Sequence, residues 1–164
     1  MRFFRMIALS AIMAAPLPAM AADAPSADAV RQVMSYFHNG SDVILVDAKL
    51  CKEVAKEGDN KNECTEEISG NKVTQGDKVY VWLNFFVPGD DADARNVLVQ
   101  FSSKGMVQQS HSLHMKQTTR YRIWYRLPTK RVGDWDVITS QEKADSYLKL
   151  GGLSYSVEEA MPAQ

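Results

Sequence analysis

The residues at positions 78–87, KVYVWLNFFV, form the most apolar run downstream of the N-terminal segment and constrain the fold most. β-Branched and aromatic residues dominate the run, and turn-forming residues bound it at positions 76–77 and 88–91, a pattern typical of a β-strand. Alternate side chains of a strand point to opposite faces. The sequence therefore predicts a central strand that is largely covered on both faces. One face would carry Val79, Val81, Leu83, Phe85 and Val87, and the other Tyr80, Trp82, Asn84 and Phe86.

Residues 1–21 have the features of a secretory signal peptide. Arg2 and Arg5 give a positively charged start, residues 6–17 form an apolar stretch, and the alanines at 19 and 21 fit the cleavage rule. The apolar stretch is well short of the ~20 residues that a membrane-spanning helix needs. We therefore expect cleavage near Ala21/Ala22 and a periplasmic or extracellular protein with no transmembrane segment in its mature chain. An uncleaved membrane anchor is the alternative.

The charge balance argues against one broad class of function. The full chain carries 19 Lys and Arg against 20 Asp and Glu residues. Loss of the two arginines in the signal peptide would leave 17 against 20, a net charge of −3 with His neutral. A chain without an excess of basic residues is poorly suited to general nucleic-acid binding.

The two cysteines, Cys51 and Cys64, are predicted to form a disulfide, because an even count in an exported protein favours pairing. The segment between them is polar and contains Gly58, Asp59 and Asn60, so the chain can fold back there. A bridge that closes about 14 residues would contribute on the order of 3 kcal/mol in the chain-entropy model. A redox-active pair is the alternative, but the spacing is not C-x-x-C. A zinc site would need more ligands.

The length predicts one folded domain. We expect the signal peptide at 1–21, a short helix and linker at 22–41, the domain at 42–158 and a flexible tail at 159–164. The helix would cover residues 26–39, where apolar residues recur at helical spacing and Asn39-Gly40 provides a stop signal. A domain of this size can bury its own core, so nothing in the sequence forces oligomerisation.

Short apolar alternations separated by turn signals recur along the domain. Strands are expected at residues 42–50, 78–87, 96–101, 106–115, 119–127, from 133 and 153–157. A short strand or turn is expected at 65–72, a tight hairpin turn at 102–105, and a polar connection at 140–150. About seven short strands with such spacing predict an all-β fold, an antiparallel immunoglobulin-like β-sandwich. Cys51 and Cys64 are too close in sequence to be the inter-sheet bridge of antibody domains.

The order of these motifs resembles a family of small uncharacterised all-β domains in bacterial envelope proteins. The resemblance extends from Val43 to Val157 and is carried by GDKVYVWLNF, VLVQF with the MV that follows, RYRIWYRL and GDWDV. It implies an immunoglobulin-like fold and an envelope location. It carries over no catalytic motif, and the cysteine-bounded segment is where this chain departs from the pattern.

One strand face is the main candidate for ligand binding. Even-numbered positions of the strand at 119–127 place three guanidinium groups and an indole on one side: Arg120, Arg122, Trp124 and Arg126. If this strand lies beside 78–87, Tyr80 and Trp82 would join them. Arginine pairs with carboxylate and phosphate through two hydrogen bonds, and Trp offers a stacking surface. Such a face can bind an envelope protein, an anionic glycan or a lipid head group.

The alternative for this face is an internal ladder. The arginine stems would then cover the indole rings, and the guanidinium groups would pair with Asp134 and Asp136 of the following strand. Such a ladder would stabilise the fold without contacting any ligand.

Two patterns admit a metal. His111, His114 and Met115 are residue types that suit copper, but the two histidines point to opposite faces of a strand. A metal site would need the strand to bulge, or ligands from elsewhere such as His38. Ordinary surface histidines and a core methionine explain the pattern more simply. Three aspartates alternate like the start of an EF-hand loop, but the Gly and the distal Glu are missing, so a solvated turn is preferred. They are Asp90, Asp91 and Asp93.

Catalytic motifs are missing from the sequence. It contains no G-x-S-x-G, no H-E-x-x-H and no phosphate-cradling loop. We therefore expect a non-enzymatic binding protein without a cofactor. A copper-handling protein and a structural module that pairs through an edge strand are the two alternatives.

Overall fold

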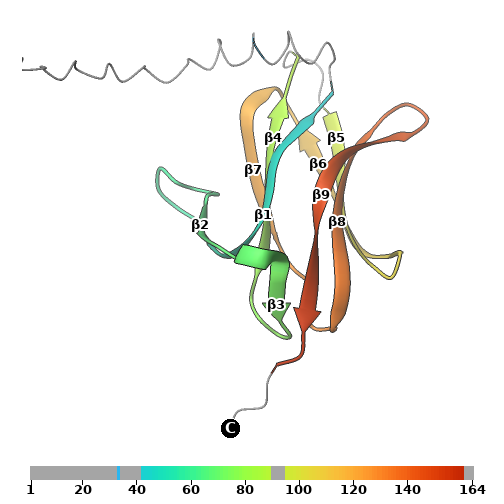
Figure 1. Cartoon of the computed structure of the whole chain (residues 1–164). Coiled ribbons are helices and arrows are strands. Elements are labelled where there is room, and N and C mark those ends of the chain that lie inside the picture. Colours follow the sequence, from blue (N-terminus) through green and yellow to red (C-terminus); the bar gives the residue numbers. More distant parts are fainter. Residues whose placement is uncertain (1–32, 34–41, 90–94, 161–164) are drawn as a thin grey trace, which may run out of the picture.

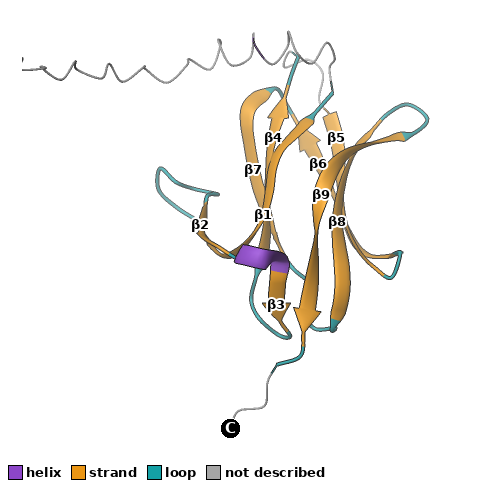
Figure 2. Ribbon diagram, in the orientation of Figure 1, coloured by secondary structure: helices purple, strands orange, loops and turns teal. Residues whose placement is uncertain are grey.

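The structure is a computed structural model that describes residues 33, 42–89 and 95–160. In this part of the chain, nine strands form two sheets that pack face to face, and one short 3-10 helix connects two of the strands (Figures 1 and 2). The predicted signal peptide lies outside the described residues, as do the predicted helix except for Val33, residues 161–164 of the tail, and Asp90, Asp91 and Asp93. Within the described ranges, no helix has the length and apolar character needed to cross a membrane.

The first sheet, sheet A, has the strand order β2-β1-β4-β7. Its members are β1 (Ile44–Val54), β2 (Cys64–Glu67), β4 (Tyr80–Val87) and β7 (Thr118–Arg126). Sheet B has the order β3-β9-β8-β5-β6. Its members are β3 (Lys72–Thr74), β5 (Arg95–Ser103), β6 (Met106–Met115), β8 (Gly133–Glu142) and β9 (Tyr147–Glu158). The 3-10 helix η1 (Ser69–Asn71) joins β2 to β3.

The strand order confirms the predicted immunoglobulin-like sandwich. β1, β4 and β7 take the places of strands A, B and E, and β9, β8 and β5 take those of G, F and C. β6 lies beside β5, as the additional strand of variable-type domains does. All described pairings are antiparallel except that of β3 with β9. The two short strands β2 and β3 explain why the sandwich exceeds the expected seven strands.

Strand β4 is covered on both faces, as predicted. Its inward side chains Val81, Leu83 and Phe85 are fully buried between the sheets, and the outward Trp82 and Phe86 are also buried. Hydrogen bonding to β1 on one side and β7 on the other makes β4 an interior strand. The core between the sheets is completed mainly by inward residues of β5, β8 and β9: Val97, Val99, Phe101, Trp135, Val137, Tyr155 and Val157.

Strand β1 departs from the expected alternation because it contains a β-bulge. The register with β4 shifts between Leu45 and Asp47, which leaves Val46 as an extra residue with 53% of its surface exposed. Leu45 packs against the core before the bulge and Leu50 after it. Strict alternation along the strand expected at 42–50 would place Ile44 and Val46 on the same face as Leu50, but the inserted residue reverses the alternation beyond it, so they do not share that face.

The expected polar connection at 140–150 is largely a strand hairpin. β8 continues to Glu142, β9 begins at Tyr147, and the two strands pair over this whole stretch (Figure 1). Tyr147 and Leu148 are exposed, so this end of the hairpin lacks the alternation of a half-buried strand. Backbone pairing with the neighbouring strand holds the extended conformation there instead.

Candidate binding surface

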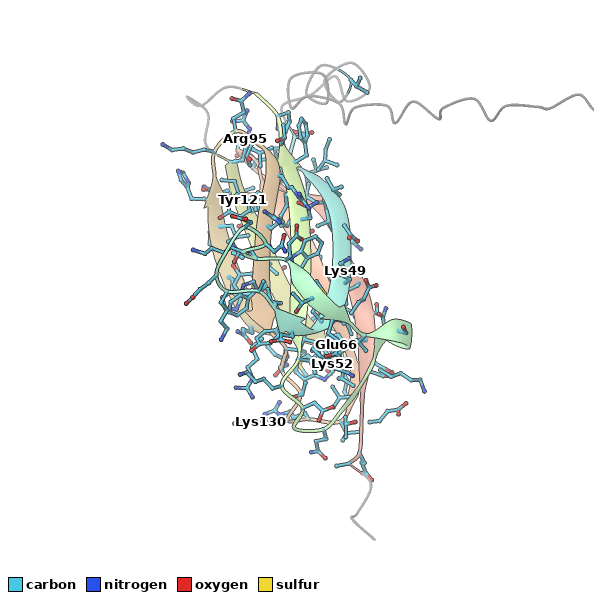
Figure 3. The ribbon with its side chains drawn as sticks, turned by 90° about the vertical axis from the view of Figure 1, so that its left-hand side faces the viewer. Lys49, Lys52, Glu66, Arg95, Tyr121 and Lys130 are labelled. Carbon is cyan, nitrogen blue, oxygen red and sulfur yellow. A yellow bond between two sulfur atoms is a disulfide. The ribbon has the colours of Figure 1, made fainter. Side chains whose placement is uncertain are left out.

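The predicted arginine–tryptophan face forms on the outer side of sheet A, which faces the viewer in Figure 3. β7 is the edge strand of this sheet, so Arg120 and Arg126 are exposed, while Arg122 and Trp124 are half-buried. The antiparallel register places β7 residues opposite β4 residues in three outward pairs: Trp124 with Trp82, Arg122 with Asn84, and Arg126 with Tyr80.

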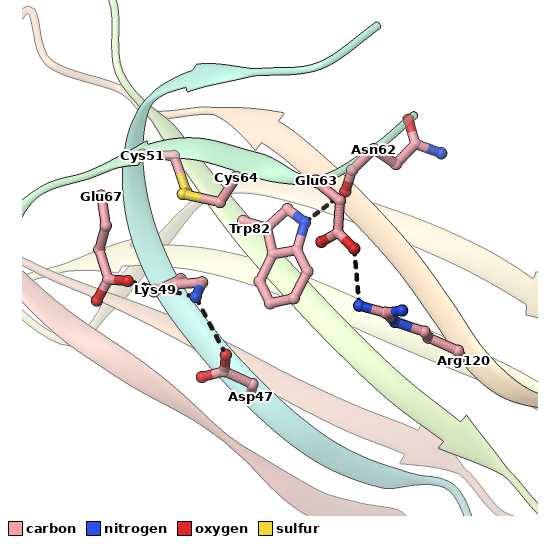
Figure 4. A network of polar contacts seen from close by, with 9 residues as sticks. All are labelled: Asp47, Lys49, Cys51, Asn62, Glu63, Cys64, Glu67, Trp82 and Arg120. Carbon is pink, nitrogen blue, oxygen red and sulfur yellow. Dashed lines mark hydrogen bonds and ion pairs between the residues drawn. A yellow bond between two sulfur atoms is a disulfide. The ribbon is translucent and has the colours of Figure 1, made fainter. Parts of the chain in front are cut away.

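The segment between the cysteines folds back over part of this face (Figure 4). Cys51 in β1 and Cys64 in β2 form the predicted disulfide, with an S–S distance of 2.01 Å and a Cα–Cα distance of 5.8 Å. Backbone hydrogen bonds from Ala55 to the Glu63 carbonyl and from Asn62 to the Ala55 carbonyl close the loop. We call residues 55–63 the disulfide loop.

Asn62 joins the disulfide loop to both tryptophans of the face. Trp82 Nε1 donates a hydrogen bond to the backbone oxygen of Asn62 at 2.5 Å, as Figure 4 shows. Trp124 Nε1 donates to the side-chain Oδ1 of the same residue at 3.3 Å. A single loop residue therefore satisfies both indole N–H groups.

A second, small apolar cluster lies beneath this loop, outside the main core. It consists of Cys51, Val54, Tyr80 and Trp82, with Cys64 and Trp124 packed against them. Trp82 retains only 4% exposure, so its ring is closed to a stacking ligand while the loop is in place. We predicted Trp82 as a ligand contact, and in this structure its ring is part of the packing beneath the loop.

Glu63 of the disulfide loop binds two of the arginines. Its Oε1 accepts a hydrogen bond from Arg120 Nη2 at 2.7 Å and another from Arg122 Nη1. The expectation that the arginines pair with Asp134 and Asp136 was wrong, because those residues lie on β8, in the opposite sheet. One carboxylate thus serves two guanidinium groups, and the first half of β7 forms the ladder that we considered as the alternative, with a different acidic partner.

Lys49 of β1 covers the other side of Trp82. Its Nζ lies 5.0 Å from the centre of the indole ring, which is cation–π geometry. Partial burial lowers the pKa of Lys49, but ion pairs with Glu67 at 3.3 Å and Asp47 at 3.6 Å outweigh that effect. The net pKa is raised, so the ammonium group stays charged over the ring.

Arg126, at the far end of β7, has a different environment. In the part of the chain that the structure describes, its side chain makes no ion pair or hydrogen bond. It borders a cavity of about 450 Å³ whose wall also includes Lys130 and Arg131. We did not predict this cavity from the sequence, although the two basic residues shortly after Pro128 were a visible signal.

The predicted copper ligands do not converge. His111 points inward and stacks on Tyr125 with ring centres 4.1 Å apart, whereas His114 points outward and its Nδ1 shares a hydrogen bond of 2.8 Å with Asn96. Met115 is fully buried. Among the described residues, no three His, Cys, Asp or Glu side chains are grouped so that they could hold a metal ion. His38 lies outside those residues.

Comparison with known proteins gives likeness in structure alone. No protein-family model and no curated protein matches the chain. The C-terminal domain of wzt is 9% identical, with coverage of 74% of this chain and 77% of that one and a TM-score of 0.48. An immunoglobulin-like protein, PA1606 from Pseudomonas aeruginosa, is 12% identical, with coverage of 71% of this chain and 97% of that one and a TM-score of 0.41. A β-glucosidase from Listeria innocua in complex with glucose is 8% identical, with coverage of 71% of this chain and 16% of that one and a TM-score of 0.40.

Proposed function

We propose that the protein is a non-enzymatic binding protein of the bacterial periplasm or cell exterior, and that it engages an anionic glycan or lipid head group through the cationic side of β7. A disulfide between the only two cysteines suits an oxidising compartment, as does the signal-peptide-like N-terminus. The single observation that carries the proposal is Arg126, an exposed arginine without an ionic partner in the described chain.

The neighbouring charges favour an anionic ligand. Arg120 keeps 58% of its side chain exposed even though it pairs with Glu63. Arg122 shares the same carboxylate, so the three arginines of β7 are balanced by one acidic side chain at contact distance in the described structure. Guanidinium groups bind carboxylates and phosphates through paired, charge-assisted hydrogen bonds, which makes β7 suited to acidic groups.

The test is capture of envelope material by the full chain, with glycan and lipid composition as the readout. We expect the wild-type protein to retain an anionic glycan or lipid, and the Arg126→Ala variant to lose most of it. Lys116→Ala is the matched control, because Lys116 is an exposed cation beyond the end of β6, away from Arg126. Equal capture by wild-type and Arg126→Ala proteins would exclude this function for β7.

A second candidate function, edge-strand pairing with an envelope protein, is favoured by the character of β6. This strand ends sheet B in the described structure, so one side of its backbone is open to a further strand. Its ten residues include no Lys, Arg, Asp, Glu or Pro, although open edges in natural proteins usually carry such protection. Met106 is 62% exposed on this strand and Val107 53%.

Two lysines on the edge separate this candidate from the first. The double variant Ser110→Lys/Ser112→Lys changes two exposed positions of β6 and should abolish capture of a protein partner. It should leave capture of glycan or lipid unchanged, because β7 belongs to the other sheet. Retention of the protein partner by this variant would exclude pairing through β6.

A further inference from the structure

The cavity beside Arg126 lies between the first part of β6 and the connection that joins β7 to β8, residues 127–132. Its volume of about 450 Å³ falls within the usual range of small-molecule sites, roughly 300–1,000 Å³. Figure 3 shows Lys130 at the end of the sandwich where this connection turns. The cavity is therefore a feature of one end of the sandwich.

The charge on the cavity wall has one sign. Arg126, Lys130 and Arg131 contribute three cations, and the lining residues, all within the described chain, include no Asp or Glu. The side chains of Arg126 and Lys130 form no ion pair with any described residue. Within the described ranges, Arg131 Nη1 donates only to the neutral amide oxygen of Gln108, at 3.3 Å. Three guanidinium or ammonium groups around a concave surface favour a ligand with a carboxylate or a phosphate.

The rest of the wall combines amides with apolar surface. Gln108 and Gln109 of β6 supply amide groups, which both donate and accept hydrogen bonds, as hydroxyl groups require. Gln108 Nε2 already donates to the Met106 carbonyl at 3.3 Å and Gln109 Nε2 is bonded to His111 Nε2 at 2.6 Å, so each amide offers a ligand its second N–H and the remaining lone pairs of its oxygen. Leu127, Pro128 and Trp135 also line the cavity and are apolar, with Leu127 and Trp135 each only 3% exposed. A sugar ring has hydroxyl groups at its edge and C–H groups on its face, so it matches both kinds of surface. A bare phosphate or carboxylate would use the cations alone.

The backbone of the connection is held in place before any ligand binds. Thr129 is buried, its Oγ1 donates to the Asp77 carbonyl at 2.7 Å, and its own carbonyl accepts from Gly76 N at 3.0 Å. The next two carbonyls are also bound, Lys130 O by Gln75 Nε2 at 2.9 Å and Arg131 O by Trp135 Nε1 at 3.2 Å. A fixed backbone reduces the entropy that binding would otherwise cost.

We propose that this cavity binds an acidic saccharide, a sugar that carries a carboxylate or a phosphate. The cations bind the acidic group, the glutamine amides bind ring hydroxyls, and the apolar wall packs against the ring. This inference rests on the proposed function, because it names the ligand class and the position for the same cationic end of β7.

The experiment is an NMR titration of the full chain with four probes: glucuronic acid, glucose 6-phosphate, glucose and inorganic phosphate. The first two should shift the side-chain amide signals of Gln108 and Gln109 and the indole signal of Trp135. Glucose lacks the acidic group and inorganic phosphate lacks the ring, so each should bind at least about tenfold more weakly. The two acidic sugars distinguish a carboxylate ligand from a phosphate ligand.

Two variants test the assignment of the wall. Lys130→Ala removes an exposed cation and Gln109→Ala an exposed amide, and each should weaken binding of the acidic sugar about fivefold or more without changing the fold. Lys116→Ala should bind like the wild type. Absence of any shift at Gln108, Gln109 and Trp135, or equal affinity of the Lys130→Ala variant, would overturn the cavity assignment.

Failure of this inference is distinct from failure of the proposed function. If the Arg126→Ala variant loses capture of envelope glycan or lipid but no acidic sugar shifts the signals of the cavity residues, β7 binds its ligand outside the cavity. The cavity proposal is then overturned and the proposed function stands. If acidic sugars bind the cavity but the full chain captures no glycan or lipid, the cavity proposal stands and the envelope function is overturned.

Discussion

The two halves of β7 carry the same outward residue type in different surroundings. Arg120 and Arg122, in the first half, bind Glu63 and help to hold the disulfide loop over a buried tryptophan. Arg126, at the other end, has no ionic partner in the described chain and borders an open cavity. The strand pattern is identical at the three positions. The difference comes from a loop more than fifty residues away in sequence, which reaches one end of the strand and leaves the other uncovered.

Removal of the disulfide should have the largest effect on stability, and it should also remove the difference between the two ends of β7, because the loop would no longer be held over the first half. A Cys51→Ala/Cys64→Ala protein is expected to lose about 3 kcal/mol of unfolding free energy, because the unfolded chain is no longer constrained. The loop would also be released from Trp82, whose fluorescence should shift to longer wavelength. Urea unfolding followed by tryptophan fluorescence measures both effects. An unshifted native spectrum would mean that Asn62 and Glu63 hold the loop without the bridge.

Single arginine substitutions should sharpen the contrast. Arg122→Ala is expected to cost about 1–2 kcal/mol, because a half-buried guanidinium that binds a half-buried carboxylate is lost. Arg126→Ala should change stability by less than about 0.5 kcal/mol, since its exposed side chain has no described partner. Urea unfolding of both variants gives the comparison. A double-mutant cycle with Glu63→Gln should show coupling for Arg122 and none for Arg126.

Equal costs for the two arginine variants would contradict the division of β7 into a structural and a binding half. Coupling between Glu63 and Arg126 would have the same meaning, because it would place the disulfide loop within reach of the whole strand.

The inward face of β7 supplies a smaller effect that depends on pH. Burial, with a lesser contribution from Tyr121, raises the pKa of Tyr125 to about 12 from its ordinary value of 10.0. The folded protein therefore favours the protonated phenol, and this stabilisation is complete below pH 10 and lost as the pH rises towards 12. Because the side chain is only half-buried, we expect a loss on the order of 1 kcal/mol.

Thermal unfolding between pH 9 and pH 12 measures this loss. Tyr125→Phe should reduce the alkaline decline, whereas Arg126→Ala should leave it unchanged. An identical decline in wild-type and Tyr125→Phe proteins would assign the alkaline sensitivity to other groups, such as Tyr155, whose pKa burial also raises.

The sequence predicted the arrangement of strands well because alternation records burial. Val97, Val99 and Phe101 alternate and are all buried, and the pairing of Lys104 and Gly105 in left-handed backbone makes the expected tight turn. The outward set on β7 also assembled as predicted. Alternation does not predict a strand whose two faces are similarly exposed, which is why the paired strands around residues 140–150 were missed. It also assigns side chains to the wrong face where a bulge inserts a residue, as at Val46.

The partners of the candidate site were less predictable. Asn62 and Glu63 lie in a polar loop without periodicity, and Glu63 is separated from Arg120 by 57 positions. Their contacts depend on how the disulfide orients the loop across sheet A, which no local pattern encodes. The cavity was hard to predict for the same reason, because Gln108 and Lys130 come from different segments and line one cavity only after both sheets are packed.

The position of β4 between two apolar clusters has a consequence for local opening of the fold. Its backbone is hydrogen-bonded on both edges, by β1 and β7, and its side chains are covered by the main core on one face and by the cluster beneath the disulfide loop on the other. Exchange of its amide protons with solvent must therefore await unfolding of the whole domain, while the open edge of β6 exchanges through small local fluctuations. The slowest-exchanging segment of the protein would thus be the same run of residues that dominates its sequence.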